Sequence, residues 1–204
     1  MGVEQEIVHD LLEIDAVQIN PENYFTWTSG VKSPIYCDNR LIMSYPEVRK
    51  KVIASFIHLI ESNHWQPDVI AGCATAGIPH AAWLSEALNL PMAYVRSKPK
   101  SHGKENQIEG LVKPGQKVLV IEDLISTGGS SIQAAHAVEN SGAEVIGVLA
   151  IFSYGLEKAK ENFKQAGFEF DTITGFDPLI EALVTNGKLT EKEKVEMLEW
   201  RDSL

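Results

Sequence analysis

The sequence has little cysteine and no long apolar run. Its two cysteines, Cys37 and Cys73, form no C-x-x-C or zinc-binding spacing, and two are too few to staple 204 residues. No apolar run approaches the roughly 18 residues that a membrane-spanning helix needs. Residues 1–10 carry three acids and no basic or apolar signal region. We therefore expect a soluble protein of the reducing cytoplasm that is neither exported nor held in a membrane.

Basic charge is also scarce. The chain has 18 Lys and Arg residues against 28 Asp and Glu residues, which gives a formal net charge of −10 at pH 7. A surface of that sign repels nucleic-acid phosphates and anionic membranes, so neither is expected as a principal partner. The 44% of hydrophobic and 23% of charged residues are ordinary globular usage and exclude a disordered or coiled-coil chain. The length favours one domain over residues 1–204, without repeats or a long linker.

Apolar runs and helical patterns alternate along most of the chain. A helix is predicted over residues 3–14, short strands and turns over residues 20–39, and a helix from the Ser44-x-x-Glu47 capping box to Asn63. Strands are predicted at residues 69–71, 92–95, 118–121, 145–152 and 168–173. Helices are predicted at residues 78–88, 130–140, 156–165, 178–184 and, after a Thr190-x-x-Glu193 capping box, 194–200. This order predicts an α/β fold with a mostly parallel central sheet flanked by helices, and the strand at residues 118–121 should lie centrally.

Residues 118–131 are the most informative segment. The buried strand delivers two adjacent carboxylates, Glu122 and Asp123, to its carboxyl end, where open α/β sheets bind ligands. A loop of hydroxyls and glycines then opens a helix, whose free N–H groups and dipole attract an anion. Acids directly before a phosphate cradle suit a ligand that carries hydroxyls or a divalent cation beside its phosphate, as a sugar phosphate does. The segment is neither a Walker loop nor a dinucleotide fingerprint, and the alternative is a solvent-exposed turn.

Residues 121–130, Ile-Glu-Asp-Leu-Ile-Ser-Thr-Gly-Gly-Ser, resemble the phosphoribosyl-diphosphate signature of type I phosphoribosyltransferases. The resemblance implies the fold of that family, and magnesium bound largely by substrate oxygens with no metal site of the protein's own. It implies that the two acids contact the ribose hydroxyls. The signature residues expected to bind phosphoribosyl diphosphate are Glu122, Asp123, Leu124, Ile125, Ser126, Thr127, Gly128, Gly129 and Ser130.

A second segment reverses the charge of this acidic chain. Residues 94–104 hold four of the 18 basic residues, one histidine and no acid. Proline, glycine and polar residues predict one long loop over residues 97–110. Such a loop is either a lid over a site or a solvated basic loop.

The same segment resembles the catalytic loop of orotate phosphoribosyltransferases through Arg96, Lys100 and His102. In that family the loop closes over the active site of the neighbouring subunit and holds the diphosphate. The resemblance therefore implies a homodimer with shared active sites. The lysine that often follows the arginine is Ser97 here, and whether Lys98 replaces it stays open.

Residues 25–40 resemble the hood that covers the base in this family. A flat, anionic pyrimidine needs an apolar surface to stack on and polar groups at its edge. Many relatives have a lysine where this chain has Thr28, and an arginine that binds the carboxylate of orotate where this chain has Tyr154. The group that binds the carboxylate therefore stays open, with Arg40 and the backbone amides of residues 29–33 as candidates.

Residues 71–77 stand where the family has its diphosphate loop, which leaves backbone N–H groups and Thr75 for binding.

The resemblance divides the chain into a hood, about residues 1–45 with the C-terminal helices, and a core of about residues 46–175. It implies transfer of ribose 5-phosphate from phosphoribosyl diphosphate to orotate in pyrimidine (UMP) synthesis. The expected catalytic residues are Lys100, His102, Glu122 and Asp123, and the expected orotate contacts are Ser126, Tyr36 and Arg40. The alternatives are an enzyme for another base and a regulator that senses phosphoribosyl diphosphate. A regulator should carry a basic face or an added domain, which this sequence lacks.

Overall fold

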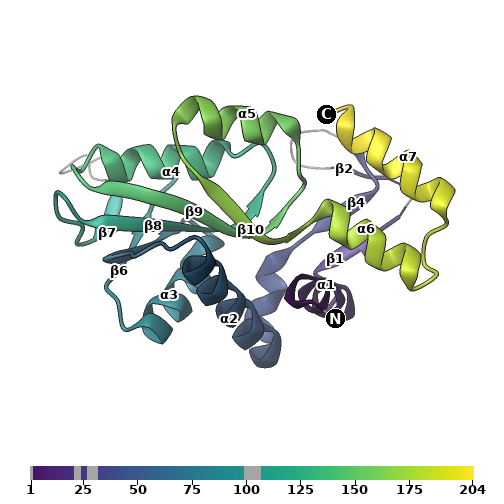
Figure 1. Cartoon of the computed structure of the whole chain (residues 1–204), viewed down its shortest axis with the longest axis horizontal. Coiled ribbons are helices and arrows are strands. Elements are labelled where there is room, and N and C mark those ends of the chain that lie inside the picture. The colour runs from purple at the N-terminus through teal and green to yellow at the C-terminus, as the bar shows by residue number, and fades with distance from the viewer. Residues whose placement is uncertain (1, 21–23, 27–31, 99–106) are drawn as a thin grey trace.

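The computed structural model describes residues 2–20, 24–26, 32–98 and 107–204. A six-stranded sheet runs through the middle of the molecule, with helices above and below it (Figure 1). The strands in spatial order are β10 (Phe170–Gly175), β9 (Glu144–Ser153), β8 (Lys117–Ile125), β5 (Val69–Cys73), β6 (Met92–Val95) and β7 (Ile108–Gly110). The first five are parallel, and β7 pairs antiparallel with β6. The predicted α/β fold with residues 118–121 in a central strand is confirmed.

The helices divide between the two faces of the sheet. They are α1 (Val3–Glu13), α2 (Pro46–Ser62), α3 (Gly77–Leu88), α4 (Gly129–Glu139), α5 (Glu157–Ala166), α6 (Phe176–Thr185) and α7 (Glu191–Asp202). Because side chains alternate along a strand, β8 sends Leu119 and Ile121 into the core with α1, α2, α3 and α6. It sends Val118 and Val120 into a second core with α4 and α5. Both faces of the central strand are therefore buried.

Two small antiparallel ladders form the segment between α1 and η1, where the sequence predicts short strands and turns over residues 20–39. β1 (Val17–Ile19) pairs antiparallel with β4 (Ile35–Cys37), and β2 (Phe25–Thr26) pairs with β3 (Lys32–Ser33). The helix α7 at the C-terminus lies beside this segment (Figure 1), and Nε1 of Trp200 donates to the carbonyl of Lys32 at 3.0 Å. The division of the chain into a hood and a core stays a prediction.

One of the two predicted capping boxes forms. Thr190 Oγ1 accepts from the N–H of Glu193 at 3.2 Å, and Oε2 of Glu193 accepts from the N–H of Thr190 at 2.8 Å. The box at Ser44 is wrong, because Ser44 ends the 3-10 helix η1 (Asn39–Ser44) and Tyr45 caps α2 instead. Glu47 therefore falls one position short of the box and pairs with Lys50 at 2.9 Å.

The prediction of one loop over residues 97–110 is wrong at its end, because the last three residues form β7 at the edge of the sheet. The alternation in Ile108-Glu109-Gly110 carries this strand, but three residues are too few for a periodic pattern to stand out. Among the helices of the described residues, none is long and apolar enough to cross a membrane.

Candidate active site

Strand β8 runs to Ile125, beyond the predicted end at residue 121, so Glu122 and Asp123 lie within it, near its carboxyl end as the sequence predicted. Its ladder with β5 ends at Ile121, whereas its ladder with β9 continues to Ile125. The last part of β8 is therefore an overhang with a neighbour on one side only. This overhang presents both acids at the carboxyl edge of the sheet, where open α/β folds bind ligands.

The loop after β8 opens α4 without a side-chain cap. Gly128 has φ of 80°, in the left-handed region that favours glycine, and a Cβ there would lie 2.5 Å from the ring of Phe163. Asn162 of α5 donates from Nδ2 to the carbonyl of Thr127 at 2.9 Å. Thr127 itself is exposed. Contacts from α5 thus hold the turn that precedes α4. The first N–H groups of α4 have no side-chain cap, and an anion can reach them.

Glu122 is 6% exposed, and its carboxylate faces the start of α4. Its Oε2 accepts from Oγ of Ser130 at 3.1 Å and from Oγ of Ser131 at 3.4 Å, and its Oε1 accepts from the N–H of Asp123 at 3.1 Å. Burial, and then repulsion by Asp123, raises the pKa of Glu122, and burial also raises the pKa of Asp123. Hydroxyl donors or a cation at this edge would therefore stabilise the charged pair.

The short segment Asp38 to Arg40 lies over the acid pair. Arg40 holds Asp38 with a two-pronged contact, from Nε to Oδ1 at 2.6 Å and from Nη2 to Oδ2 at 2.8 Å. The charge of Arg40 also opposes the rise that burial causes in the pKa of Asp123. Asn39 is 1% exposed and donates from Nδ2 to the carbonyl of Asp123 at 2.7 Å. The structure thus brings two predicted site residues, Arg40 and Asp123, to one place.

Two tyrosines lie beside this segment. Tyr36 is 38% exposed, and its ring centroid is 5.8 Å from that of Phe25. Tyr154 is buried, and its pKa is raised first by burial and then by Cys37 and Tyr36. Tyr154 therefore lies near β4, close to the predicted orotate contact. Thr28, the other position in question, lies outside the described residues.

The loop between β5 and α3 lies beside the acid pair. Gly77, the first residue of α3, packs so close to the carbonyl of Ile121 that a Cβ would collide with it. Ala74 donates its N–H to the carbonyl of Val95 at 2.8 Å, and the Ala74–Thr75 peptide bond is cis. Thr75 is exposed. This predicted diphosphate loop is therefore held between β8 on one side and the end of β6 on the other.

The basic segment leaves the sheet from the ends of β6 and β7. Arg96 donates its N–H to the carbonyl of Gln107 at 2.9 Å and accepts from Nε2 of Gln107 at 2.7 Å. Nη1 of Arg96 is 3.8 Å from Oε1 of Glu109. Lys100 and His102 belong to residues 99–106, which lie outside the described residues. The structure thus places the base of the predicted catalytic loop, directly after the strand that contacts the diphosphate loop.

Sequence reasoning missed three residues of this site: Asn39, Ser131 and Asn162. Each makes a polar contact with the signature segment, and two of these contacts span 84 and 35 positions in the sequence. An asparagine in a turn or on a helix is too common to signal a long-range contact. Only Ser131, which directly follows the signature within residues 118–131, stood where the pattern could have included it.

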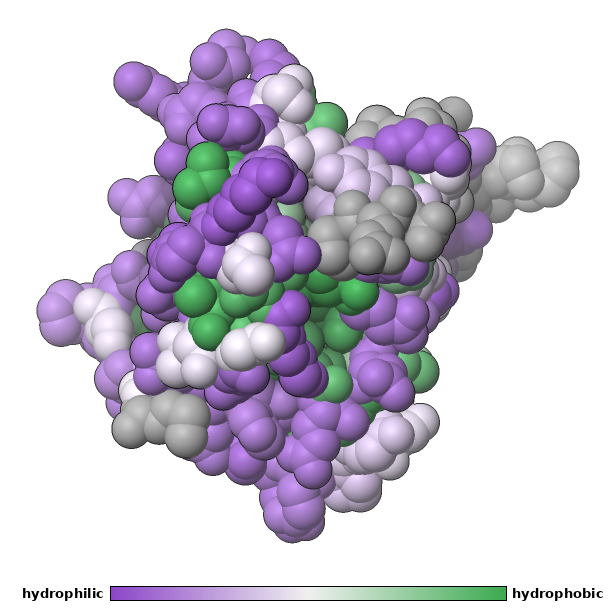
Figure 2. Space-filling model, turned by 90° about the vertical axis from the view of Figure 1, so that its right-hand side faces the viewer, coloured by the Kyte–Doolittle hydropathy of each residue, from purple (hydrophilic) through white to green (hydrophobic). Residues whose placement is uncertain are grey.

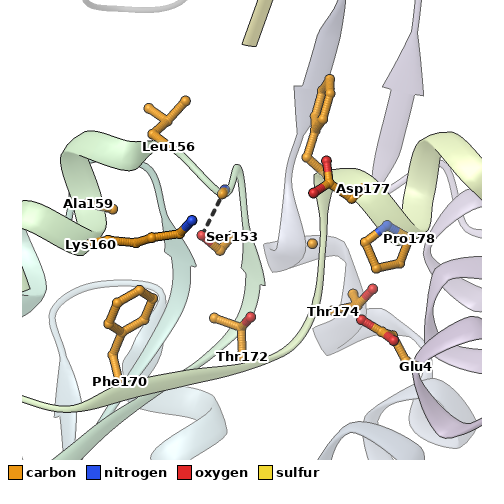
Figure 3. A pocket seen from close by; sticks show the side chains of 13 residues that line it. Glu4, Ser153, Leu156, Ala159, Lys160, Phe170, Thr172, Thr174, Asp177 and Pro178 are labelled. Atoms are coloured by element: carbon orange, nitrogen blue, oxygen red, sulfur yellow. Dashed lines mark hydrogen bonds between the residues drawn. The ribbon is translucent and has the colours of Figure 1, made fainter. Parts of the chain in front are cut away.

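Other hollows lie elsewhere on the surface. A cavity of about 230 Å³ opens between α5, β10 and α6 (Figure 3), where Oγ of Ser153 accepts from the N–H of Gly155 at 3.1 Å. A groove of about 620 Å³ lies between α1, β1 and the end of α6, with Leu12, Leu183 and Leu189 in its lining. Figure 2 shows the face of α1, α6 and α7, where hydrophobic residues lie in a hollow ringed by hydrophilic residues. No described residue of the predicted site lines either hollow.

Comparisons with known proteins agree with this arrangement. Residues 42–175 match the model of the phosphoribosyl transferase domain. The chain is 62% identical over 200 residues to an orotate phosphoribosyltransferase of Oceanobacillus iheyensis, which covers 98% of this chain and 99% of that protein. Among solved structures, it is similar to the UMP synthase of Leishmania donovani, with TM-score 0.82, 27% identity, and coverage of 98% of this chain and 42% of that chain. It is also similar to the orotate phosphoribosyltransferase of Aeropyrum pernix, with TM-score 0.78, 25% identity, and coverage of 90% and 99%.

Proposed function

We propose that this chain, which belongs to the orotate phosphoribosyltransferase family, transfers ribose 5-phosphate from phosphoribosyl diphosphate to orotate. The products are diphosphate and orotidine 5-monophosphate, the precursor of UMP in pyrimidine synthesis. The observation that carries the proposal is the acid pair in the β8 overhang, followed at once by the uncapped start of α4. The first element suits sugar hydroxyls and the second suits a phosphate, so the two together match a ribose phosphate.

Asp123 and Glu122 contact the ribose hydroxyls in this proposal. As the bond from C1 to the diphosphate stretches, positive charge builds on the ribose ring, and nearby carboxylates stabilise it. Glu122 is already bound by Ser130 and Ser131, so it links the ribose to the start of α4. This is electrostatic catalysis with ordering of two substrates, and no covalent enzyme intermediate is required.

The 5-phosphate binds to the loop and the first turn of α4, from Thr127 to Ser130. Support comes from the N–H groups without a side-chain cap and from the contacts of Asn162 and Phe163 that hold the loop. The neighbouring residues of the signature, Leu124, Ile125 and Ser126, complete the pocket through their backbone, and Ser126 contacts orotate.

Orotate lies between the hood and the acid pair. Tyr36 offers an exposed ring for stacking, and Arg40 offers the charge for the carboxylate. Two donor groups of Arg40 hold Asp38, so orotate must use the remaining N–H groups of the guanidinium. Tyr154 is buried close to Cys37 and Tyr36 and so lies behind this position.

The diphosphate leaves toward Thr75 and the basic loop. Arg96 stands at the base of that loop, next to the strand end that contacts Ala74. Lys100 and His102 act in the site of the neighbouring subunit of a homodimer, and Lys98, which is exposed, is a further cation for the leaving group. Cations at this place stabilise the charge that the diphosphate gains as it departs.

Magnesium fits this site through its donor set. Mg²⁺ prefers hard oxygen ligands and binds commonly through one or two carboxylates together with substrate phosphates. Glu122 and Asp123 are the described residues that would meet it, and their raised pKa values mean that a cation nearby would favour their charged forms. When bound, Mg²⁺ supplies positive charge to the diphosphate oxygens. The cytoplasmic location stays a prediction.

The direct test is the loss of the ultraviolet absorbance of orotate in the presence of phosphoribosyl diphosphate and magnesium. We expect orotate to be consumed, with adenine, hypoxanthine and uracil as controls that react far more slowly. Faster reaction of another base would assign the chain to that base. Binding of phosphoribosyl diphosphate with no reaction of any base would favour the regulator.

A further inference from the structure

Asn39 connects two segments, residues 38–40 and the end of β8, whose relative position matters for the proposed reaction. It stands at the start of η1, directly before Arg40, and its side chain is almost completely buried. Its Nδ2 donates to the carbonyl of Asp123 at 2.7 Å, across 84 positions of sequence. One amide therefore connects the hood to the main chain of the proposed catalytic acid.

The position of this contact in the sheet gives it weight. Asp123 lies in the β8 overhang, beyond Ile121, where the ladder with β5 has ended. A strand edge without a neighbouring strand is freer to move than a strand between two partners, because fewer backbone hydrogen bonds hold it. Asn39 supplies a hydrogen bond to β8 beyond the end of its ladder with β5. Its amide thus substitutes locally for the missing strand.

The thiol of Cys37 sets the orientation of this amide. Its Sγ donates to Oδ1 of Asn39 at 3.4 Å, which leaves Nδ2 toward Asp123. Burial raises the pKa of the Cys37 thiol, so it keeps its proton and acts as a donor at neutral pH. Both ends of the Asn39 side chain are thus satisfied, as a buried amide requires.

We propose that Asn39 is a positioning residue, which places the Asp123 carboxylate against the ribose by holding the main chain of Asp123 to the hood. The inference rests on the proposed function. A displacement of about 1 Å at a reacting group can cost on the order of a hundredfold in rate, so one hydrogen bond to the backbone of such a group affects turnover as well as stability. The same contact makes the geometry of the acid depend on a seated hood.

A double-mutant cycle tests this inference. The variants are Asn39→Leu, which keeps the size and removes the donor, Asp123→Asn, and the two together. If Asn39 acts through the Asp123 carboxylate, Asn39→Leu lowers kcat about tenfold in the wild-type chain but less than about twofold in the Asp123→Asn chain. A merely structural asparagine would lower the melting temperature and reduce kcat by the same factor in both chains. That second result overturns the inference.

Two further variants secure the interpretation. Asn63→Ala is the matched control, because Nδ2 of Asn63 also donates to a main-chain carbonyl, that of Leu59 at 2.9 Å. This substitution should leave kcat unchanged. If Asn39→Leu does not fold, Asn39→Ala removes the donor without adding a charge beside Asp123, and the same cycle is measured. Wild-type protein that does not consume orotate overturns the proposed function. Active wild-type protein with equal effects in the two backgrounds overturns only the role of Asn39.

Discussion

Asp123 combines features that rarely occur together in one side chain. It is an acid in a parallel strand, it stands next to a second acid, and burial raises its pKa while Arg40 opposes that rise. A strand interior gains nothing in stability from such a group, because the charged form is costly to bury. The arrangement is explained if the acid meets positive charge during the reaction.

Asp123→Asn should therefore lower kcat by at least roughly tenfold while the fold survives, because the lost charge matters most in the transition state. Turnover of orotate and thermal melting are measured on the same preparation. Unchanged kcat would remove Asp123 from the mechanism, and a collapsed melting curve would leave only a structural role.

Glu122 gives a prediction about pH. Its pKa is raised in the folded protein, so the folded state keeps a proton that the unfolded chain has lost at the same pH. The stability cost of this group is therefore absent below the ordinary glutamate pKa, and it grows as the pH rises toward the raised value. Glu122→Gln should raise the free energy of unfolding relative to wild type at about pH 8, and change it little at about pH 4. Denaturant unfolding at both pH values measures the difference. An equal difference at both would contradict it.

At the scale of elements, the alternation of strands and helices was predictable, because the apolar runs are buried on both faces and the helices are amphipathic. The acid pair and the glycine loop were predictable because they are adjacent in sequence. The short strand β7 and the failure of the capping box at Ser44 were not predictable from local sequence. β7 forms by pairing with β6, and Ser44 belongs to the 3-10 helix η1 that precedes α2. The contact of Asn39 with Asp123 depends on the folded chain as a whole.

The hood gives a prediction about specificity. A site built around a charged group is left with unpaired partners when that group is absent. The enzyme should therefore prefer orotate over uracil, which lacks the carboxylate, by at least roughly a hundredfold in kcat/KM. Initial rates with each base at saturating phosphoribosyl diphosphate measure the ratio. Comparable rates would argue against the substrate assignment.

Arg40→Ala tests the proposed contact with the carboxylate. The Arg40 guanidinium is exposed and pairs with Asp38. Because exposed ion pairs contribute little to stability, the substitution should leave folding intact. The KM for orotate should rise about tenfold or more, while the rate with uracil changes little. An unchanged KM for orotate would make Arg40 a partner of Asp38 only, and would leave backbone amides as the carboxylate site.

At the scale of the whole molecule, the proposed mechanism needs more than one chain. If Lys100 acts in the neighbouring subunit's site, a twofold dimer contains two equivalent composite sites. Lys100→Ala and Asp123→Asn homodimers should each be nearly inactive. After subunit exchange, a mixed dimer has one site with both lesions and one site with neither. Random pairing makes about half of the dimers mixed, so activity should recover to roughly a quarter of wild type.

The exchange itself has to be demonstrated for that result to count. Size-exclusion chromatography gives the oligomeric state, and a pull-down through a tag on one subunit shows that mixed dimers formed. Lys113→Ala, mixed in the same way with Asp123→Asn, is the control for a lysine outside the basic loop. That pair should lack a complementation effect, because Lys113→Ala homodimers should be fully active from the start. If mixed dimers form and activity stays at the level of the two parents, Lys100 acts in its own subunit or not at all, because a shared site would have been restored.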